Sequence, residues 1–445
     1  MHRRKFLGLL SALGGSLAGC NYNASGPKSD ITRMPDKQSN HISESPQTAG
    51  SLDSIEKQIE KMPAFNNHFH PGLQPTIASF DWYFTQDTIF PSNAVTRIVM
   101  EALQELLGCR LEGKNTRDVR RIYEKYCRQH TQRDFYTSLA DLTNTSHIVF
   151  MSEHWNAENK NLASGRMLLV PYASHWIFPL DNTALKKRHS FSNVMIQQRE
   201  ARLQQDQRRF NCQPSSFQFY LDFIDRALDE YRRTPHVVGL KWGFAYWRTL
   251  DIQLVTKAQA QTVYESQDSR PEPYKKLQDY LIFHILKKCA QLQLPLQIHT
   301  GLGAQGCLVL PQSNPALLDL LFSQSEFDNA RVACLHGGYP YCKELGVVVR
   351  RKNVWLDFSW MVLLLQPEEL APYLKEWIQI AGAHKLLFGI DGTGLAQVVG
   401  TSCARKALSI ALSQLTRQGF YSLEQALNAA QAILQKNALR FYNLS

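Results

Sequence analysis

The 445-residue sequence lacks several patterns that are typical of nucleic-acid-binding, membrane-spanning or dinucleotide-binding proteins. It has no zinc-finger spacing, no long run of Lys and Arg, and no stripe of alternating aromatic and basic residues, so nothing favours a nucleic-acid partner. After residue 20 it has no uninterrupted apolar run of about 18 residues, the length that a membrane-spanning helix needs. No glycine-rich phosphate loop follows an early apolar run, which disfavours a dinucleotide-binding fold.

The pattern of a disulfide scaffold is also absent. Nine cysteines are scattered along the chain without CxxC spacing, whereas disulfide-rich domains are short and secreted. The formal charge is +10, and three of the basic residues (Arg3, Arg4 and Lys5) lie in the first segment. A chain beginning at Cys20 has 46 Lys and Arg against 39 Asp and Glu, a net charge of +7. This balance predicts a mild attraction to anionic surfaces or substrates.

The first twenty residues form a candidate leader sequence. Residues 1–20, MHRRKFLGLLSALGGSLAGC, have a basic start, a short apolar run and small residues before Cys20, which is the layout of a secretory signal. Arg3–Leu7 resembles a bacterial twin-arginine signal, and Leu17–Cys20 resembles a lipobox, whose cysteine is lipidated after cleavage. We expect a signal peptide and a cell-envelope protein held on the periplasmic side of the membrane only by a lipid on Cys20. An uncleaved, disordered tail is the alternative.

The rest of the chain divides into a tether and a folded body. Residues 21–50 are rich in Ser, Asn, Pro, Lys and Gln and have almost no apolar periodicity, which predicts a flexible tether. Residues 51–445 alternate apolar, strand-like runs with segments of helical periodicity. Eight strand-like runs occur, at 64–70, 147–152, 166–172, 237–243, 294–300, 331–336, 354–359 and 385–391.

Alternating strands and helices imply a parallel sheet, and eight such units favour closure into a (β/α)8 barrel, the TIM-barrel fold. An open, doubly wound sheet is the alternative. The residues beyond a minimal barrel lie mainly in Phe90–Asp141 and Asp181–Ser215, after the first and third runs. We expect these helical insertions to cap the face at the carboxyl ends of the strands, where such barrels carry their catalytic residues.

The first run ends in two histidines. In FNNHFHPG, a period of two directs His68 and His70 to one side of the strand and Phe69 to the other. This pattern alone is weak evidence for a metal site, because an exposed strand end also tolerates histidine. Four later runs also end in ligand-type residues: Lys241, His299, His336 and Asp391.

In a closed barrel these strand ends share one cavity. A buried carboxylate and several imidazoles in that cavity are costly to desolvate unless they bind a cation or one another. The plain alternatives are turn histidines for His299 and His336, a helix cap for Asp391 and a lysine that reaches solvent from the barrel rim for Lys241.

Longer segments resemble the amidohydrolase superfamily and, within it, the amidohydrolase-related (amidohydrolase 2) family. The resemblance spans about residues 62–444, and its most specific segments are NNHFHPG, VVGLKWGFAYWR, LPLQIHTGLG, ACLHGGYPYCKELGVVVRRKNVWLDFSWM, HKLLFGIDGTG and AILQKNALRFYNL. It implies a (β/α)8 barrel in which four residues bind a divalent metal: His68, His70, His299 and Asp391.

The resemblance also implies roles for two more residues. His336 is either a ligand of a second metal or a proton-transfer residue, and Lys241 is either a carboxylated, bridging ligand or a cation that contacts an anionic substrate. We favour one metal, with zinc ahead of manganese or iron, and Lys241 as a substrate contact. Two positions depart from the family: Asn66 and Ala304 stand where Asp is common, which affects the orientation of a ligand histidine and the usual substrate contact respectively.

The expected reaction is hydrolysis of an amide, ester or lactone of a small molecule by a metal-activated water. Asp391 takes the proton of the water, and His336 stabilises the oxyanion or acts as the acid. Arg248 and Tyr339 are candidate substrate contacts. The alternatives are a metal-dependent decarboxylase or lyase on the same scaffold and a non-catalytic binding lipoprotein. Two further histidines either line the cavity or are ordinary loop residues: His154 and His175.

Overall fold

The strands of the fold form where the sequence has its apolar runs. The computed structural model describes residues 55–71, 93–114, 116–152, 162–186, 190–212, 215–303 and 308–444, all within the unit Ser45–Ser445. The predicted signal peptide and the tether lie outside the described residues, and so do Cys20, His154 and Ala304.

Each of the eight predicted runs overlaps one strand, and β2 begins two residues before its predicted run. The strands are β1 (Ala64–Phe69), β2 (Thr145–Ser152), β3 (Met167–Pro171), β4 (Leu240–Trp242), β5 (Leu296–Ile298), β6 (Val332–Cys334), β7 (Val354–Asp357) and β8 (Leu386–Leu387). Neighbouring strands pair in parallel, in the orders β1-β2-β3 and β4-β5-β6-β7-β8.

Backbone contacts join these two sheets at both seams. Between β3 and β4, an isolated parallel bridge pairs Tyr172 with Lys241. Beyond β8, the amide of Asp391 donates to the carbonyl of His68 at 2.8 Å, which ties the chain after β8 to β1. The strands therefore follow one another in a closed order, and the predicted (β/α)8 barrel is confirmed.

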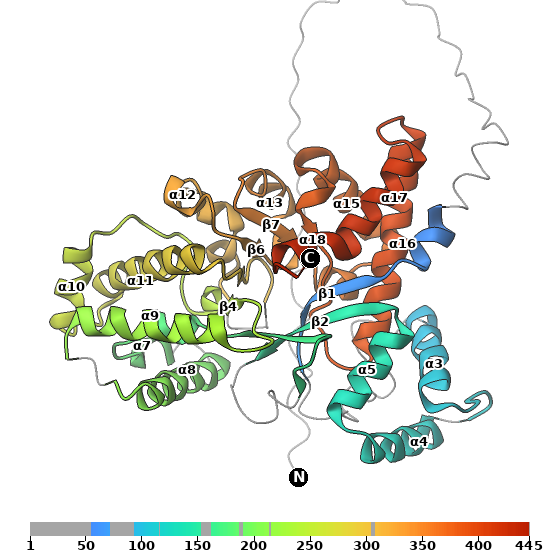
Figure 1. The fold of residues 1–445 in the computed structure, drawn as a ribbon, viewed down its shortest axis with the longest axis horizontal. Coiled ribbons are helices and arrows are strands. Elements are labelled where there is room, and N and C mark those ends of the chain that lie inside the picture. Colours follow the sequence, from blue (N-terminus) through green and yellow to red (C-terminus); the bar gives the residue numbers. More distant parts are fainter. Residues whose placement is uncertain are drawn as a thin grey trace, which may run out of the picture. The chain divides into compact units, whose positions relative to one another are not determined.

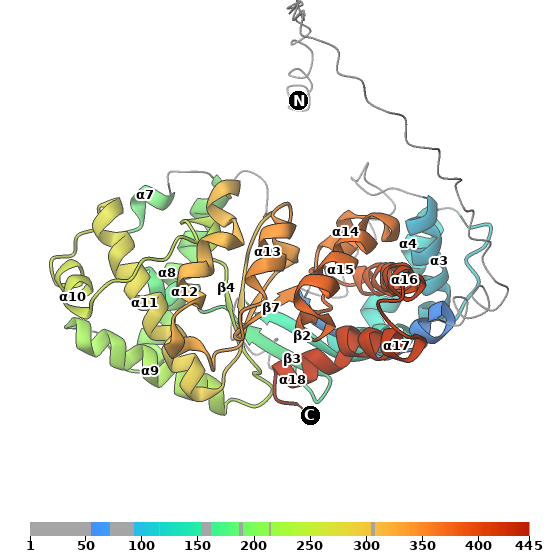
Figure 2. The same ribbon diagram turned by 90° about the horizontal axis from the view of Figure 1, so that it is seen from above.

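Helices surround the strands, which lie in the middle of the described unit in both views (Figures 1 and 2). The α-helices are α3 (Asn93–Leu107), α4 (Thr116–Gln129), α5 (Gln132–Leu142), α7 (Thr183–Lys186), α8 (Ser190–Arg209), α9 (Phe217–Arg233), α10 (Lys257–Glu265), α11 (Pro271–Leu292), α12 (Asp319–Phe322), α13 (Cys342–Val348), α14 (Met361–Leu364), α15 (Pro367–Ala381), α16 (Ala396–Arg417), α17 (Leu423–Gln431) and α18 (Asn437–Phe441). Shorter turns are η1 (Ser174–Ile177), η2 (Phe244–Tyr246), η3 (Leu310–Ser313), η4 (Pro315–Leu318), η5 (Ser325–Phe327), η6 (His336–Gly338), η7 (Ala383–Lys385) and the π-helical η8 (Ala432–Lys436).

The helical layer follows from the periodicity of the sequence. In α9 the buried side chains recur at spacings of three and four residues, from Phe217 through Ile224 to Tyr231, so that one face packs on the barrel. The helix begins where the side chain of Ser216 accepts a hydrogen bond from the amide of Phe219. Among the described helices, none combines the length and the apolar composition needed to cross a bilayer. The described cysteines are free thiols: Cys109, Cys127, Cys212, Cys289, Cys334, Cys342 and Cys403.

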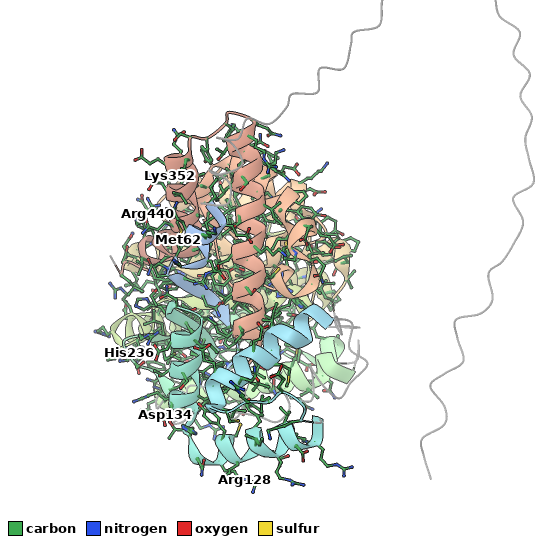
Figure 3. All side chains as sticks on the ribbon, turned by 90° about the vertical axis from the view of Figure 1, so that its right-hand side faces the viewer. Met62, Arg128, Asp134, His236, Lys352 and Arg440 are labelled. Carbon is green, nitrogen blue, oxygen red and sulfur yellow. The ribbon has the colours of Figure 1, made fainter. Side chains whose placement is uncertain are left out.

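The two insertions take different places. Helix α8 packs on η1, and the guanidinium of Arg199 lies over the rings of Tyr172 and Trp247, at the carboxyl ends of β3 and β4. Helices α3 and α5 pack on each other and on α16, and α4 packs on α3. Figure 3 shows this layer, with Arg128 in α4 and Asp134 in α5 labelled. The predicted cap is therefore seen for α8, whereas the described part of the first insertion thickens the outer layer.

The last helix closes the amino end of the barrel. Inward-facing strand residues form a cluster with side chains of α18 and of Tyr442, which follows it: Phe65, Val149, Met151, Leu168, Val170, Ala333, Leu387, Ala438, Phe441 and Tyr442. A Cβ atom added at Gly239, just before β4, would lie 3.4 Å from Cε1 of Tyr442. The amino half of the barrel interior is therefore filled, and polar chemistry is left to the carboxyl ends of the strands.

Candidate metal centre

A β-bulge in β1 directs the first histidine into the barrel. Between Asn66 and Phe69, β1 has one residue more than the facing segment of β2, so the side chains no longer alternate strictly. Asn66 faces the outer layer, where its side-chain amide donates to Gln397 of α16 at 2.8 Å. The next two residues, Asn67 and His68, both make their side-chain contacts inside the barrel.

Asp391 lies at the centre of a cluster of imidazoles. Its Oδ1 atom is 3.0 Å from Nε2 of His68 and 2.9 Å from Nε2 of His70, and its Oδ2 atom is 3.5 Å from Nδ1 of His336. His299 joins through His336, with its Nδ1 atom 3.1 Å from Nε2 of that residue. Of the residues described, His68, His336 and Asp391 offer ligand atoms that all lie within 4.8 Å of one another. The five residues predicted as ligands or catalytic groups are therefore neighbours.

Two members of the cluster have an unusual backbone. The φ angle is 57° at Asp391 and 64° at His336, in the left-handed region that residues other than glycine rarely adopt. Such conformations cost about 1–3 kcal/mol and persist where the surroundings impose them, often at functional sites. The turns after β6 and β8 are thus built to aim these two side chains into the cavity.

Hydrogen bonds fix which nitrogen of His68 carries its proton. Nε2 of Gln297 lies 2.8 Å from the carbonyl of Asn67, which can only accept, so Oε1 of Gln297 faces Nδ1 of His68 at 2.8 Å. Nδ1 of a neutral His68 therefore carries the hydrogen, and Nε2 presents a lone pair to Oδ1 of Asp391. Two acceptors 3.0 Å apart repel each other unless a proton or a cation lies between them.

The same reasoning applies to His299. Its Nε2 atom lies 2.9 Å from the carbonyl of Leu302, so Nε2 of the neutral ring carries the hydrogen and Nδ1 presents its lone pair to the cluster. Neutral imidazole nitrogens together with a carboxylate are ligands that zinc, manganese and iron accept. The donor set of this cluster therefore fits a divalent cation.

The pKa values favour the ligand forms of these groups. Burial, and next the ammonium of Lys241, lowers the pKa of His68 and brings that of His299 well below its usual value. Burial likewise brings the pKa of His336 well below its usual value. Burial alone would raise the pKa of Asp391, but the neighbouring imidazoles of His336, His68 and His70 outweigh it and hold it well below its usual value. Neutral imidazoles around an ionised carboxylate are the result.

The three predicted substrate contacts lie in different surroundings. Lys241 is buried, and its positive charge contributes to the lowered pKa values of His68 and His299. Arg248 forms a buried ion pair with Asp279 of α11, and its role as a substrate contact stays a prediction. Tyr339 is half-buried after β6, and its carbonyl accepts from the amide of Leu302 at 2.6 Å. Tyr246, which follows β4, has its ring centroid 4.6 Å from that of His299 and lines the cluster more directly.

His175 does not line the cavity. It is fully buried in η1, and its Nε2 atom is 2.8 Å from Oδ2 of Asp206 in α8. Trp176 donates to the same carboxylate oxygen at 3.3 Å, and Arg202 pairs with the other oxygen at 3.3 Å. The histidine at the end of β3 thus attaches the capping helix to the barrel.

Sequence reasoning missed a second layer of polar residues beneath the cluster. Five buried side chains form it: Asn67, Gln297, Asp357, Ser359 and Tyr442. The two-residue period placed Asn67 on the side away from His68, and the strand VWLDFS carrying Asp357 had no signal beyond its apolar pattern. A polar residue at an otherwise apolar inward position, such as Gln297 before His299, was the available clue.

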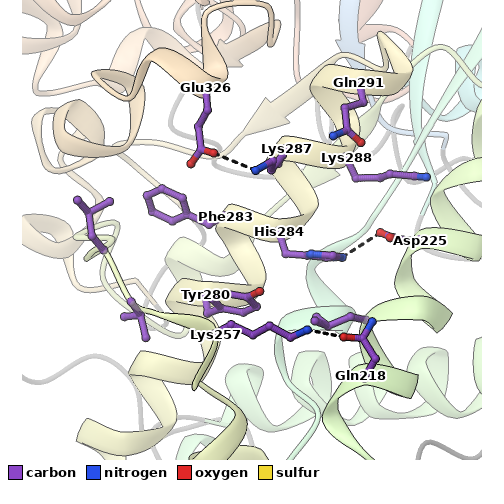
Figure 4. A pocket seen from close by; sticks show the side chains of 13 residues that line it. Gln218, Asp225, Lys257, Tyr280, Phe283, His284, Lys287, Lys288, Gln291 and Glu326 are labelled. Carbon is purple, nitrogen blue, oxygen red and sulfur yellow. Dashed lines mark hydrogen bonds and ion pairs between the residues drawn. The ribbon is translucent and has the colours of Figure 1, made fainter. Parts of the chain in front are cut away.

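A pocket on the outer surface is chemically separate from the cluster. It has a volume of about 530 Å3 and lies along α9 and α11. Figure 4 shows two of its ionisable pairs, with Lys287 3.2 Å from Glu326 and His284 2.9 Å from Asp225. None of the cluster residues lines this pocket.

A parallel eight-stranded barrel with imidazoles and a carboxylate gathered at the carboxyl ends of its strands is the architecture of a metal-binding (β/α)8 protein. Residues 207–444 match the family model described as Amidohydrolase, and the chain belongs to this family. The protein of Emericella nidulans named Protein fluG is 31% identical over 228 residues, which are 47% of this chain and 26% of that protein. The chain thus spans about a quarter of the length of this relative.

Solved structures share the fold. A Lactobacillus casei protein assigned as a metal-dependent hydrolase has a TM-score of 0.60 at 15% identity, over 88% of this chain and 97% of its own. Glucuronate isomerase from Caulobacter crescentus has a TM-score of 0.59 at 12% identity, over 92% and 97% of the two chains. Uronate isomerase from Thermotoga maritima has a TM-score of 0.59 at 10% identity, over 88% and 97%. At these identities the likeness concerns the fold alone.

Proposed function

We propose that the protein is a metal-dependent hydrolase that cleaves an amide, ester or lactone bond of a small molecule. One observation carries the proposal: the lone pair of His68 Nε2 and the carboxylate Oδ1 of Asp391 face each other at 3.0 Å, an arrangement that a divalent cation stabilises. The proposed ligands are His68, His70, His299 and Asp391. Zinc is the preferred ion, and manganese or iron also suits nitrogen and oxygen ligands.

A divalent ion in this site would lower the pKa of a bound water and polarise a substrate carbonyl. Asp391 is held ionised, so its carboxylate can take a proton from the attacking water and pass it to the leaving group. His336 lies 3.5 Å from that carboxylate and can stabilise the developing negative charge on the substrate oxygen or donate the proton. His336 is buried and the side chain of Asp391 is only 12% exposed, which limits contact with bulk water and strengthens these interactions.

Lys241 gives the proposed site a preference for anionic substrates. Its side chain is buried, and its charge acts on His68 and His299. A buried ammonium favours a nearby carboxylate or similar anion. We expect Lys241→Met to raise the KM of an anionic substrate more than that of a neutral analogue.

Metal binding is the first test of the proposal. Protein purified with zinc, manganese or iron should retain about one ion per chain, measured by elemental analysis. His68→Ala should lose the ion with its fold intact by circular dichroism, because it removes a ligand. His284→Ala, in the outer pocket, is the matched control and should retain the ion. A folded wild-type protein that binds none of these ions would refute the metal site.

The reaction is tested by turnover. Metal-loaded protein should hydrolyse members of a set of lactones, amides and esters, and Asp391→Asn should reduce kcat by about 100-fold or more, in line with the loss of a general base. Aromatic carboxylates in the same screen test decarboxylation. Release of carbon dioxide without any hydrolysis would replace the proposed reaction with that of a lyase.

We also propose that the chain is exported as a lipoprotein. The support is the sequence of residues 1–20, with its twin-arginine-like start and the lipobox ending at Cys20. Expression of the full chain in a bacterium should place it in the membrane fraction on the periplasmic side. Cys20→Ser should release it from that fraction, and an unchanged distribution would contradict lipid anchoring.

A further inference from the structure

A chain of hydrogen bonds runs from the metal-binding cluster through the barrel interior to the last helix. Nδ1 of His68 is 2.8 Å from Oε1 of Gln297. The amide of Gln297 donates to the hydroxyl of Tyr442 at 2.6 Å, and that hydroxyl donates to Oδ1 of Asn67 at 2.6 Å. All four side chains are buried. Tyr442, at the amino end of the barrel, is therefore two hydrogen bonds away from a proposed metal ligand.

The same chain continues to the opposite side of the cluster. The amide of Asn67 donates to Oδ2 of Asp357 at 2.8 Å, and the backbone amide of Ser359 donates to Oδ1 of that carboxylate at 2.9 Å. Oγ of Ser359 then lies 3.0 Å from Nδ1 of His336. Two imidazoles of the cluster, His68 and His336, thus have their outer nitrogens tied to one buried network.

The direction of the central bonds is determined by chemistry. The Gln297 amide nitrogen points at two groups, the carbonyl of Asn67 and the hydroxyl of Tyr442, and so must donate to both. The hydroxyl of Tyr442 has one hydrogen and uses it on Oδ1 of Asn67, which turns the amide of Asn67 towards the carboxylate of Asp357. Each group therefore holds the next in one orientation, and rotation of the Gln297 amide would break both of its donor bonds.

We propose that Tyr442 is a positioning residue of the metal centre, which holds Gln297 so that His68 keeps its hydrogen on Nδ1 and presents Nε2 to the cation. The inference rests on the proposed function for the identity of the bound ion alone. Partners of this kind set the tautomer and ring orientation of a ligand histidine, and their loss typically lowers metal affinity about 10- to 100-fold. Tyr442 acts here from the far end of the barrel, through Gln297.

The test is to remove the hydroxyl alone. Tyr442→Phe should lower the affinity for zinc at least about tenfold, measured by competition with a chromophoric chelator. Tyr220→Phe is the matched control, because Tyr220 is also fully buried and its hydroxyl donates to the carbonyl of Trp176 at 2.6 Å, remote from the cluster. It should lose a similar amount of stability and keep wild-type affinity. Wild-type zinc affinity in folded Tyr442→Phe would overturn the proposal.

A second measurement separates this inference from the proposed function. The 15N shifts of the His68 ring, assigned by comparison with His68→Gln, report its tautomer in the metal-free protein. Wild type should show the hydrogen on Nδ1, and Tyr442→Phe should show a mixture of tautomers. If the wild type binds no metal, the proposed function fails. The positioning role of Tyr442 is then tested only by the tautomer of the His68 ring in the metal-free protein. A single, unchanged tautomer in Tyr442→Phe would then refute its positioning role.

A third variant keeps the proposal testable if Tyr442→Phe does not fold. Gln297→Met keeps the length of the side chain but removes both the acceptor for His68 and the donors to Tyr442. It should weaken zinc binding at least as much as Tyr442→Phe, and the double variant should lose no more than Gln297→Met, because both changes act along one path. If Tyr442→Phe does not fold, wild-type affinity in Gln297→Met overturns the proposal by itself.

Discussion

His336 and His299 face each other across the cluster, with Nε2 of the first 3.1 Å from Nδ1 of the second. Because Nε2 of His299 donates to the carbonyl of Leu302, its Nδ1 atom accepts, and Nε2 of His336 must then be the donor between the neutral rings. The two histidines therefore form a coupled pair, and their separate contributions to metal binding are not independent.

This coupling predicts non-additive effects of mutation. His299→Gln and His336→Gln should each weaken metal binding, and the double variant should lose less binding free energy than the two losses combined. The interaction term should be on the order of 1 kcal/mol, as for residues in direct contact. Metal titration of the four proteins measures it. Strict additivity would show that the rings act separately in solution.

Acid should destabilise the metal-free protein well above the range in which carboxylates titrate. The pKa values of His68, His299 and His336 are lowered in the folded state, so below about pH 6.5 the unfolded chain binds protons that the folded chain does not. The free energy of unfolding should therefore fall as the pH drops from 7 to 5, by up to about 1.4 kcal/mol per pH unit for each such group. The lowered pKa of Asp391 extends the loss below about pH 4.

Urea unfolding of the metal-free protein at several pH values measures this slope. His336→Gln should have a shallower slope than wild type, since one of the three groups is gone. A free energy of unfolding that stays constant between pH 7 and 5 would show that the buried imidazoles keep their ordinary pKa values.

Gly389 is predicted to tolerate no side chain. A Cβ atom at this position would overlap Oδ2 of Asp357 and would lie 3.0 Å from Cβ of Ser359 and 3.2 Å from Cβ of His68. Gly389→Ala should cost about 1–3 kcal/mol of stability, as overpacking does, and should also weaken metal binding by displacing His68. Gly165→Ala is the control, because a Cβ there meets no atom within 4 Å. Equal melting temperatures of the two variants would contradict the prediction.

Asn66→Asp restores the residue that is common in the family and should nevertheless destabilise this protein. The Asn66 amide donates to Oε1 of Gln397, and the amide of Gln397 is already directed at Thr143, Thr145 and Thr401. A carboxylate at position 66 would place two acceptors together in a buried site, at a cost of about 1–3 kcal/mol. Because residue 66 faces the outer layer, zinc affinity should change less than threefold. Thermal melts and chelator competition test both parts.

The sequence predicted the barrel well because its signals are local. Each strand is an apolar run that can be recognised by itself, and the strand ends carrying Lys241, His299, His336 and Asp391 must meet once the barrel closes. The relation between these residues followed from topology, and required no knowledge of side-chain packing.

What the sequence did not reveal depends on single-residue detail. The bulge between Asn66 and Phe69 breaks the two-residue period, so Asn66 faces the outer layer and Asn67 faces the barrel interior, the reverse of a strict alternation from His68. The ion pair of Arg248 with Asp279 joins residues from different elements, and no local pattern announces it. Placement of α3 and α5 in the outer layer likewise depends on packing against α16, a helix more than 250 residues further along the chain.

Helix α18 follows all members of the cluster in the chain, and Tyr442 comes directly after it. During synthesis, the histidines of the cluster therefore emerge from the ribosome before the segment that closes the amino end of the barrel. Until that segment is made, their side chains lack the hydrogen bonds that orient them. We therefore expect the proposed metal centre to bind its ion stably only after the whole chain has been synthesised.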